Sequence, residues 1–149
     1  MILVTTGSTM PFDSLVAAID EAVNRAEITE KVICQIGNGG YQPQHCEHFR
    51  FQESIDQLID EASLVITHGG TGTVTDLIKR QKRFIAVANP MGADNHQVEF
   101  LAKLATISNF IWTDEPTSVV ALLKKSENIK PSGLLTPSLF DDLKTYIRA

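Results

Sequence analysis

The chain has 149 residues, a formal net charge of -5 and two cysteines, Cys34 and Cys46. Its length suits one domain with a substantial core, and its acidic balance argues against general nucleic-acid binding, which needs a basic face. Two cysteines fit a reducing compartment and predict no disulfide framework. Residues 1–7 lack the features of a signal peptide, and no later apolar run is long enough to span a bilayer. We therefore expect a single cytoplasmic domain over residues 1–149, with no nucleic acid among its partners.

Short apolar runs alternate with segments of helical periodicity. The pattern predicts strands at residues 2–5, 32–36, 49–51, 64–66, 84–87 and 111–112, and helices at 15–23, 55–62, from the turn at 67–73 to about 82, 95–104, 119–124 and about 138–148. Because the strands are apolar on both faces, we expect an α/β fold, a parallel sheet of about six strands with helices on both faces. The terminal helix carries an apolar stripe that packs on its own domain or on a partner.

The most distinctive stretch is the glycine-rich turn 67–73, which follows the strand at 64–66. Such a turn lets backbone amides approach a ligand, and the helix N-terminus behind it favours a phosphate. Its glycines match neither G-x-G-x-x-G nor a P-loop, which disfavours a nicotinamide or ATP site. Asp76 lies three residues beyond Thr73 on the same helix face, where a ribose could lie. The alternative is a tight turn in which Asp76 only stabilises the helix dipole.

Three further stretches admit two interpretations each. Residues 94–97, Asp-Asn-His-Gln, follow the next strand and either cap a helix or bind sugar hydroxyls. Residues 45–48 with Cys34 suggest zinc, but their spacing is poor, and the chain has no Asp-x-Asp pair for a divalent ion, so we expect no metal. The basic residues 79–83 end a helix in solvent or attract an anionic membrane surface.

Three separated motifs, taken together, resemble those of a known family. They are Val4-Thr5-Thr6-Gly7-Ser8-Thr9 with Pro11-Phe12-Asp13, then residues 67–76, then residues 94–97. They resemble the nucleotide-sugar-binding C-terminal half of the two-domain GT-B glycosyltransferases, in particular glycosyltransferase family 28. Within it they are similar to the branch that holds the small catalytic subunit of the dolichol-linked UDP-GlcNAc transferase and bacterial subunits of exopolysaccharide and capsule synthesis. The resemblance implies a Rossmann-like fold equivalent to that half.

The resemblance also implies which residues bind the donor. They are Gly7, Ser8, Thr9, Phe51, Gln52, His68, Gly69, Gly70, Thr71, Gly72, Thr73, Asp76, Asp94, Asn95, His96 and Gln97. By this analogy His68 and the amides of 70–73 hold the diphosphate, the Thr73 hydroxyl donates to it, and Asp76 binds the ribose, where the family more often has Glu. Residues 96–97 read the sugar, residues 51–52 meet the uracil edge, and residues 7–9 line the donor from the opposite loop.

Full family members have an N-terminal domain that binds the acceptor and usually carries the catalytic base, whereas this sequence starts at the donor domain. The resemblance therefore implies the donor-binding catalytic subunit of a heteromeric inverting glycosyltransferase. It would move a sugar from a UDP-sugar to a polyprenyl-diphosphate-linked acceptor, with a membrane-anchored, acceptor-binding partner that recruits it to the inner face of the membrane. No cofactor is expected, and His68 and His96 are the candidates for a base. The alternatives are a non-catalytic stabilising subunit and a stand-alone enzyme.

Overall fold

The computed structural model describes residues 1–8, 10–91, 96–127, 129 and 131. The elements in chain order are β1 (Ile2–Thr5), α1 (Asp13–Asn24), β2 (Val32–Gln35), β3 (Glu47–Phe49), α2 (Asp56–Glu61), β4 (Leu64–His68), α3 (Thr71–Lys79), β5 (Phe84–Val87), α4 (His96–Leu104), β6 (Ile111–Thr113), the 3-10 helix η2 (Pro116–Ser118) and α5 (Val119–Ser126). The helix expected at about 138–148 lies outside the described residues.

The six strands form one parallel sheet in the order β3-β2-β1-β4-β5-β6, which confirms the predicted architecture. This is the order of the doubly wound Rossmann fold. Strands are added in one direction from β1 to β3 and in the other from β4 to β6, so the topological switch point lies between β1 and β4. Thr5 pairs with Thr67 across it. Loops that leave these two strands diverge, and ligands of such sheets bind in the crevice between them.

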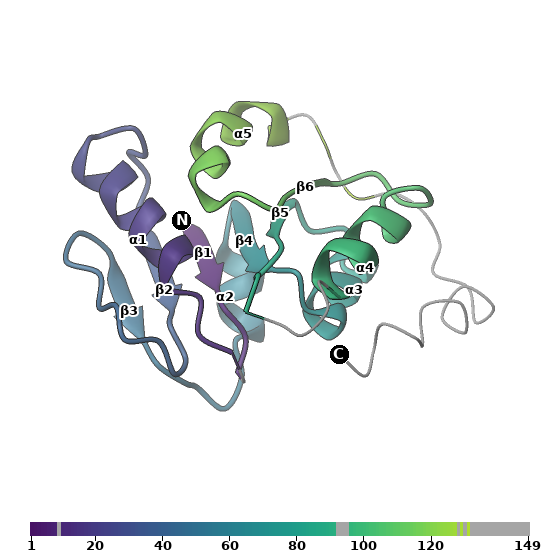
Figure 1. The fold of residues 1–149 in the computed structure, drawn as a ribbon. Coiled ribbons are helices and arrows are strands. Elements are labelled where there is room, and N and C mark those ends of the chain that lie inside the picture. Colours follow the sequence, from purple (N-terminus) through teal and green to yellow (C-terminus); the bar gives the residue numbers. More distant parts are fainter. Residues whose placement is uncertain (9, 92–95, 128, 130, 132–149) are drawn as a thin grey trace.

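Alternate residues along each strand face opposite sides of the sheet and build two cores. In β1, Ile2 and Val4 pack in the cluster that α1 and α5 cover, whereas Leu3 packs in the cluster that α2, α3 and α4 cover. Figure 1 shows α1 and α5 on one side of the sheet and α3 and α4 on the other. The strands β1, β4 and β5 are thus buried on both faces, and they hold the loops that follow them in fixed positions.

Several predicted boundaries were wrong. Strand β4, for example, runs to His68, so Thr67 and His68 belong to the strand and not to the turn. Two further differences have a clear physical cause. The third strand is Glu47–Phe49 instead of residues 49–51, and its first two residues are exposed at the sheet edge, so an apolar pattern did not mark it. Helix α3 ends at Lys79, short of residue 82. Gln81 has a φ of 55°, a left-handed conformation, and the N–H of Lys82 donates to the carbonyl of Leu77 at 3.0 Å. This Schellman-type bond stops the helix.

Candidate functional site

A pocket of about 230 Å³ opens at the carboxyl edge of the sheet, beside the switch point. Its walls are the loop after β1, the segment between β3 and α2, and the first turn of α3. The lining residues are Thr5, Gly7, Ser8, Gln35, Phe51, Gln52, Glu53, Ser54, Ile55 and Thr73. The fold therefore brings Gly7, Ser8, Phe51, Gln52 and Thr73 together, although they come from three separate stretches. Phe51 is 53% exposed at the rim, where its ring can offer a flat apolar face.

His68 ends β4 and lies between the two glycine-containing loops. A Cβ at Gly7 would lie 2.7 Å from Cε1 and Nε2 of the imidazole, and a Cβ at Gly70 would overlap Cε1 as well. Both positions therefore need glycine so that the loops can close on the ring. Nε2 of His68 is buried and has no hydrogen-bond partner among the described residues. Burial lowers the pKa of His68 from 6.5 to about 4, so the imidazole is neutral at pH 7.

The N-terminus of α3 begins directly after this ring. Gly70 is the N-cap and has no side-chain cap hydrogen bond. The amides of the first turn, at residues 71–73, have no acceptor within the helix, and the helix dipole makes this end partially positive. Apart from its chain neighbours and the nearby backbone of its own helix, no atom of the described residues lies within 4 Å of a Cβ built at Gly72, so packing does not require glycine there. A buried unpartnered nitrogen and an uncapped helix end together suit an anion.

Asp76 lies one turn beyond Thr73 on α3, and its carboxylate forms an ion pair with the guanidinium of Arg80. Nε of Arg80 donates to Oδ2 of Asp76 at 2.9 Å, and the same guanidinium bonds to Asp60 and Asp56 on α2. The side chain of Asp76 is 47% exposed. Arg80 occupies one oxygen and leaves the other carboxylate oxygen available for a ligand hydroxyl.

Gln97 links the loops after β4 and β5. Its Oε1 accepts the N–H of Gly69 at 3.0 Å and the N–H of Asn89 at 2.7 Å. Only the NH₂ group of this side chain is left to meet a sugar. Gln97 therefore also positions the two loops, which the motif did not reveal. His96 opens α4. Thr9, Asp94 and Asn95 lie outside the described residues.

Sequence reasoning missed two residues that organise the site, Gln35 and Arg80. Gln35 is 6% exposed and lies at the end of β2, where its side chain forms four hydrogen bonds to neighbouring loops. A glutamine closing an otherwise apolar strand was a usable signal, because a buried amide must find partners. Arg80 was assigned only to a basic helix end, and no spacing rule connects it to the aspartates of α2.

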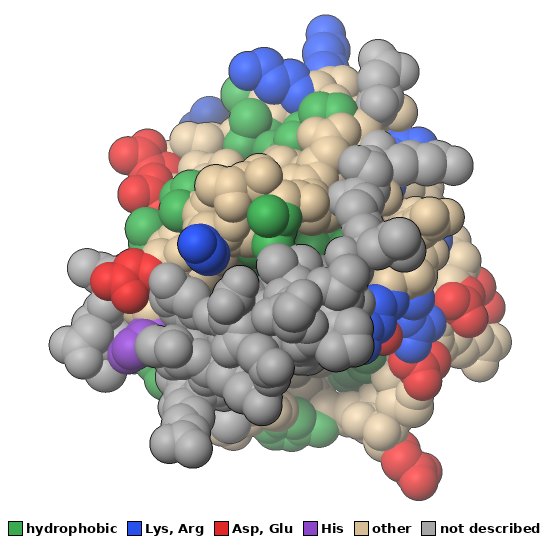
Figure 2. All heavy atoms as spheres, turned by 90° about the vertical axis from the view of Figure 1, so that its right-hand side faces the viewer, with side chains coloured by type: hydrophobic (Ala, Val, Ile, Leu, Met, Phe, Trp, Pro, Cys, Tyr) green, Lys and Arg blue, Asp and Glu red, His purple; other side chains and the backbone are tan. Residues whose placement is uncertain are grey.

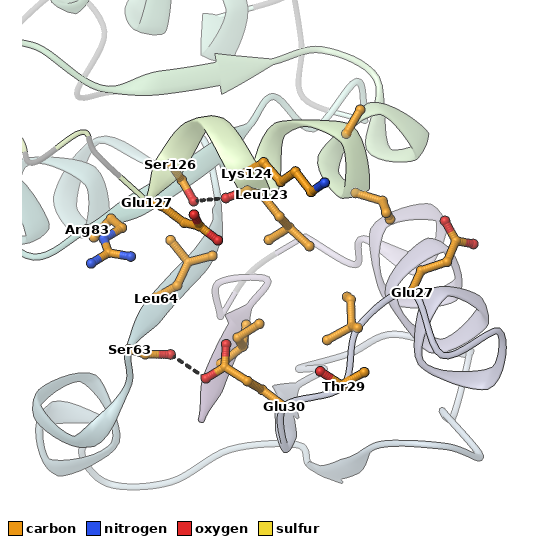
Figure 3. A pocket seen from close by; sticks show the side chains of 14 residues that line it. Glu27, Thr29, Glu30, Ser63, Leu64, Arg83, Leu123, Lys124, Ser126 and Glu127 are labelled. Carbon is orange, nitrogen blue, oxygen red and sulfur yellow. Dashed lines mark hydrogen bonds between the residues drawn. The ribbon is translucent and has the colours of Figure 1, made fainter.

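The chain offers a second pocket, of about 540 Å³, at the opposite edge of the sheet (Figure 3). Ser63 donates there to Oε1 of Glu30 at 2.8 Å, and Arg83 and Glu127 line it as well. None of the residues that the sequence singled out for donor binding lines this cavity, and the amino ends of parallel strands are not where such sheets bind ligands. The smaller pocket at the carboxyl edge is therefore the candidate site.

Within the described residues, no group of three or more His, Cys, Asp and Glu side chains could hold a metal ion, and no helix is long and apolar enough to cross a membrane. On the face in Figure 2, described Lys and Arg side chains are scattered, with Asp and Glu beside several of them. Within the basic segment, Arg80 is surrounded by aspartates and Nζ of Lys82 bonds to the carbonyl of Asp60 at 3.3 Å. These contacts favour the solvated helix end over membrane attraction.

The parallel sheet and its strand order define a domain of the Rossmann-like class. The model of the glycosyltransferase family 28 C-terminal domain matches residues 1–136, and the chain belongs to this family. Its fold is similar to a solution structure of ALG13 (TM-score 0.62, 22% identity, 99% of this chain and 96% of that one). It is also similar to Acinetobacter baumannii MurG (TM-score 0.63, 20% identity, 85% of this chain and 41% of that one). The fold is thus that of the C-terminal half of a GT-B glycosyltransferase.

Sequence relatives include several proteins named UDP-N-acetylglucosamine transferase subunit ALG13. The chain is 28% identical over 132 residues to the protein of Yarrowia lipolytica, covering 80% of this chain and 67% of that one. It is 29% identical over 114 residues to the Homo sapiens protein, covering 69% and 10%. It is 33% identical over 88 residues to the Saccharomyces cerevisiae protein, covering 56% and 43%. The chain therefore spans about two thirds of the first relative and less than half of the other two.

Proposed function

We propose that this chain is the donor-binding catalytic subunit of a heteromeric inverting glycosyltransferase that uses a UDP-sugar. The observation that carries the proposal is the unpartnered Nε2 of His68 beside the uncapped start of α3. Thr73 in the first turn of this helix lines the same pocket as Phe51 and Gln52. Family membership supports a glycosyltransferase donor domain, and the relatives' names support a UDP-sugar as donor.

In the proposed complex, the diphosphate lies against the amides of residues 71–73 and the imidazole of His68. The uracil lies towards Phe51 and Gln52, and the ribose between Thr73 and Asp76. A carboxylate accepts well from vicinal hydroxyls, and the oxygen of Asp76 not bound by Arg80 is positioned on the same helix face as Thr73. The proposal needs no cofactor and no metal ion, because backbone amides and the helix dipole stabilise the diphosphate.

The proposed reaction is the attack of an acceptor hydroxyl on the anomeric carbon of the donor. A general base takes the proton of the acceptor hydroxyl as the oxygen–carbon bond forms on the face opposite UDP, the bond from the anomeric carbon to the diphosphate oxygen breaks, and UDP leaves with the electron pair. A general base works best with a pKa near the working pH. Because burial holds the pKa of His68 near 4, we assign His68 to hydrogen bonding with the diphosphate, and the base to His96 or to the partner subunit.

The acceptor proposed here is a polyprenyl-diphosphate-linked sugar, presented by a membrane-anchored subunit at the cytoplasmic face of the membrane. Support for a partner comes from the word subunit in the relatives' names. It also comes from the candidate pocket, which is built from one edge of one sheet and lies open to solvent.

Gly72→Ala tests the proposed diphosphate position. The added methyl group meets no described atom outside its chain neighbours and the nearby helix backbone, and Ala is the better helix former, so we expect unchanged or slightly higher thermal stability. A diphosphate held by the amides of 71–73 would be pushed away, and we expect UDP affinity in calorimetry to fall at least about tenfold. The control is Gly40→Ala, which adds a methyl group 3.6 Å from Asp13 and outside the pocket lining. Equal UDP binding by the Gly72 variant and the unaltered chain would disprove this pose.

A further inference from the structure

Gln35 connects two walls of the candidate pocket. It closes β2, and its side chain lies at the floor of the pocket with only 6% of the residue exposed. Nε2 donates to the carbonyl of Gly7 at 3.1 Å in the loop after β1. The same nitrogen donates to the carbonyl of Arg50 at 3.0 Å, directly before Phe51. One amide group thus fixes the distance between the loop that carries Ser8 and the segment that carries Phe51 and Gln52.

The oxygen of the same amide is equally occupied. Oε1 of Gln35 accepts the hydroxyl of Thr5 at 2.8 Å and the N–H of Thr6 at 3.1 Å. Both donor hydrogens and both acceptor positions of the side chain are therefore in use. A flipped amide would face its NH₂ group towards the Thr6 N–H and its oxygen towards two carbonyls, so the orientation is determined by its partners. Gln35 has no hydrogen-bonding capacity left for a ligand, although it lines the pocket.

The two loops do not depend on the Gln35 side chain alone, because other bonds tie each of them separately to the end of β2. The N–H of Thr6 donates to the backbone carbonyl of Gln35 at 3.3 Å, and the N–H of Gly37 donates to the carbonyl of Arg50 at 3.1 Å. The guanidinium of Arg50 donates to the carbonyls of Gly37 and Gly39 at 3.0 and 2.8 Å, which shapes the segment between β2 and β3. The hydroxyl of Thr6 donates to the backbone carbonyl of Gln35 at 3.0 Å, which anchors the first loop to β2. Among the side-chain bonds of the described residues, those of Gln35 Nε2 connect Gly7 with Arg50 directly.

We infer that Gln35 is a positioning residue for donor binding, which acts by holding the loop of Gly7 and Ser8 at a fixed distance from Phe51 and Gln52. This inference rests on the proposed function, since it concerns the same UDP pocket. A nucleotide held between these walls needs both at once, so a loss of Gln35 lowers nucleotide affinity without removing any ligand contact.

The first test is Gln35→Met, which keeps the length of the side chain and removes all four hydrogen bonds. We expect UDP affinity to fall by about tenfold or more. It is measured by calorimetry at a temperature that lies about 15 °C under the unfolding midpoint of each variant. The matched control is Ile28→Ala, a core truncation at the opposite edge of the sheet, where Ile28 is 5% exposed and lines the other pocket. We expect the control to lose stability but to keep its UDP affinity. Unchanged UDP affinity in the Gln35 variant would overturn the inference.

The second test is Gln35→Glu, which remains informative if the first variant does not fold. Its carboxylate still accepts from Thr5 and Thr6, but the ionised group repels the carbonyls of Gly7 and Arg50. Desolvation and these dipoles raise the carboxyl pKa above its usual value of about 4.3, and the protonated acid donates one hydrogen bond back. The ratio of variant to unaltered UDP affinity should therefore rise as the pH is lowered from 7.5 to 5. A residue with a merely structural role would give a flat ratio, and that result would contradict the inference.

These experiments separate the inference from the proposed function. If the unaltered chain binds UDP and the Gln35 variants bind it equally well, the donor site stands and the positioning role is wrong. If the unaltered chain does not bind UDP, the proposed donor site is wrong, and the role of Gln35 in it is overturned too.

Discussion

His68 is a side chain whose protonation is altered by burial in the fold. Burial lowers its pKa from 6.5 to about 4. An unfolded chain takes up a proton near pH 6.5, whereas the folded chain does so only near pH 4, so the free energy of unfolding falls as the pH drops through this window. The contribution of His68 to the free energy of unfolding is fully present above pH 6.5, and roughly 3 kcal/mol of it is lost by pH 4.

The measurement is urea unfolding of the unaltered chain and of His68→Gln between pH 7.5 and 4. We expect the unaltered chain to lose stability more steeply, because the variant has no imidazole to protonate at this position. His48→Gln serves as the control, since His48 is exposed. Bound UDP should raise the pKa of His68, since its phosphates favour the imidazolium, and NMR titration would show this shift. Parallel pH profiles of the two chains would refute the burial argument.

Asp76→Ala tests the proposed ribose contact. Hydrogen bonds to a charged group contribute about 1.5 to 3 kcal/mol, so we expect UDP affinity in calorimetry to fall by about tenfold to a hundredfold. Asp60→Ala is the matched control, because Asp60 also pairs with Arg80, at 3.3 Å, but lies on α2. It should leave UDP affinity within about twofold. Equal UDP affinity for the Asp76 variant and the unaltered chain would remove the ribose assignment.

The glycine-rich turn between β4 and α3 could be predicted from sequence, but its hydrogen-bond partners could not. Glycine spacing after an apolar strand predicts a turn, and the structure places His68 between Gly7 and Gly70. The bonds of Gln97 to Gly69 and Asn89, and those of Gln35 to Gly7 and Arg50, join residues that are distant in the sequence. Only the sheet order brings these loops together, and no local pattern encodes it.

Helices and strands differed in how well their limits could be predicted. Strand β4 was recognised because its strand residues are buried on both faces, and this gives a continuous apolar run. Strand β3 was misplaced because it is an edge strand whose Glu47 and His48 are exposed. The end of α3 depends on Gln81 in a left-handed conformation, which is uncommon outside glycine and so had no sequence signal.

Arg80 on α3 connects this helix to α2 through ion pairs. Its removal tests how much these ion pairs contribute to the packing of the two helices. Its guanidinium bonds to Asp56, Asp60 and Asp76, and its side chain is 28% exposed. Exposed ion pairs contribute about 0 to 1 kcal/mol each, so we expect Arg80→Ala to lower the free energy of unfolding by about 1 kcal/mol, less at high salt. Arg25→Ala, which breaks a single exposed pair with Glu21, should cost less than about 0.5 kcal/mol.

Both variants are measured by urea unfolding at 0.05 and 1 M salt. Freed from Arg80, Asp76 can adopt other rotamers, and UDP affinity of the Arg80 variant should also decrease. An Arg80 variant as stable as the unaltered chain at both salt concentrations would show that the three aspartates do not couple the helices.

In the molecule as a whole, the sheet order places the candidate site at one open edge. The loops after β1 and β4 diverge at the switch point, and the walls of the pocket come from one face of the domain. Among the described residues, no element covers the solvent side of this pocket, so none excludes water from a sugar bound there or holds an acceptor against it. Glycosyl transfer needs both, because water competes with the acceptor hydroxyl for the anomeric carbon.

Partner dependence is therefore the prediction that belongs to the whole molecule. We expect the chain alone to bind UDP but to transfer no sugar from UDP-N-acetylglucosamine to a polyprenyl-diphosphate-linked acceptor. Addition of a membrane-anchored, acceptor-binding subunit in vesicles should start transfer, followed by radiolabelled product. Asp76→Ala should lower transfer in the same vesicles by at least about tenfold at subsaturating donor, since the donor site lies in this chain. Turnover by the chain alone would identify a stand-alone enzyme, whereas full transfer by the Asp76 variant would mean that the partner binds the donor and this chain only stabilises it.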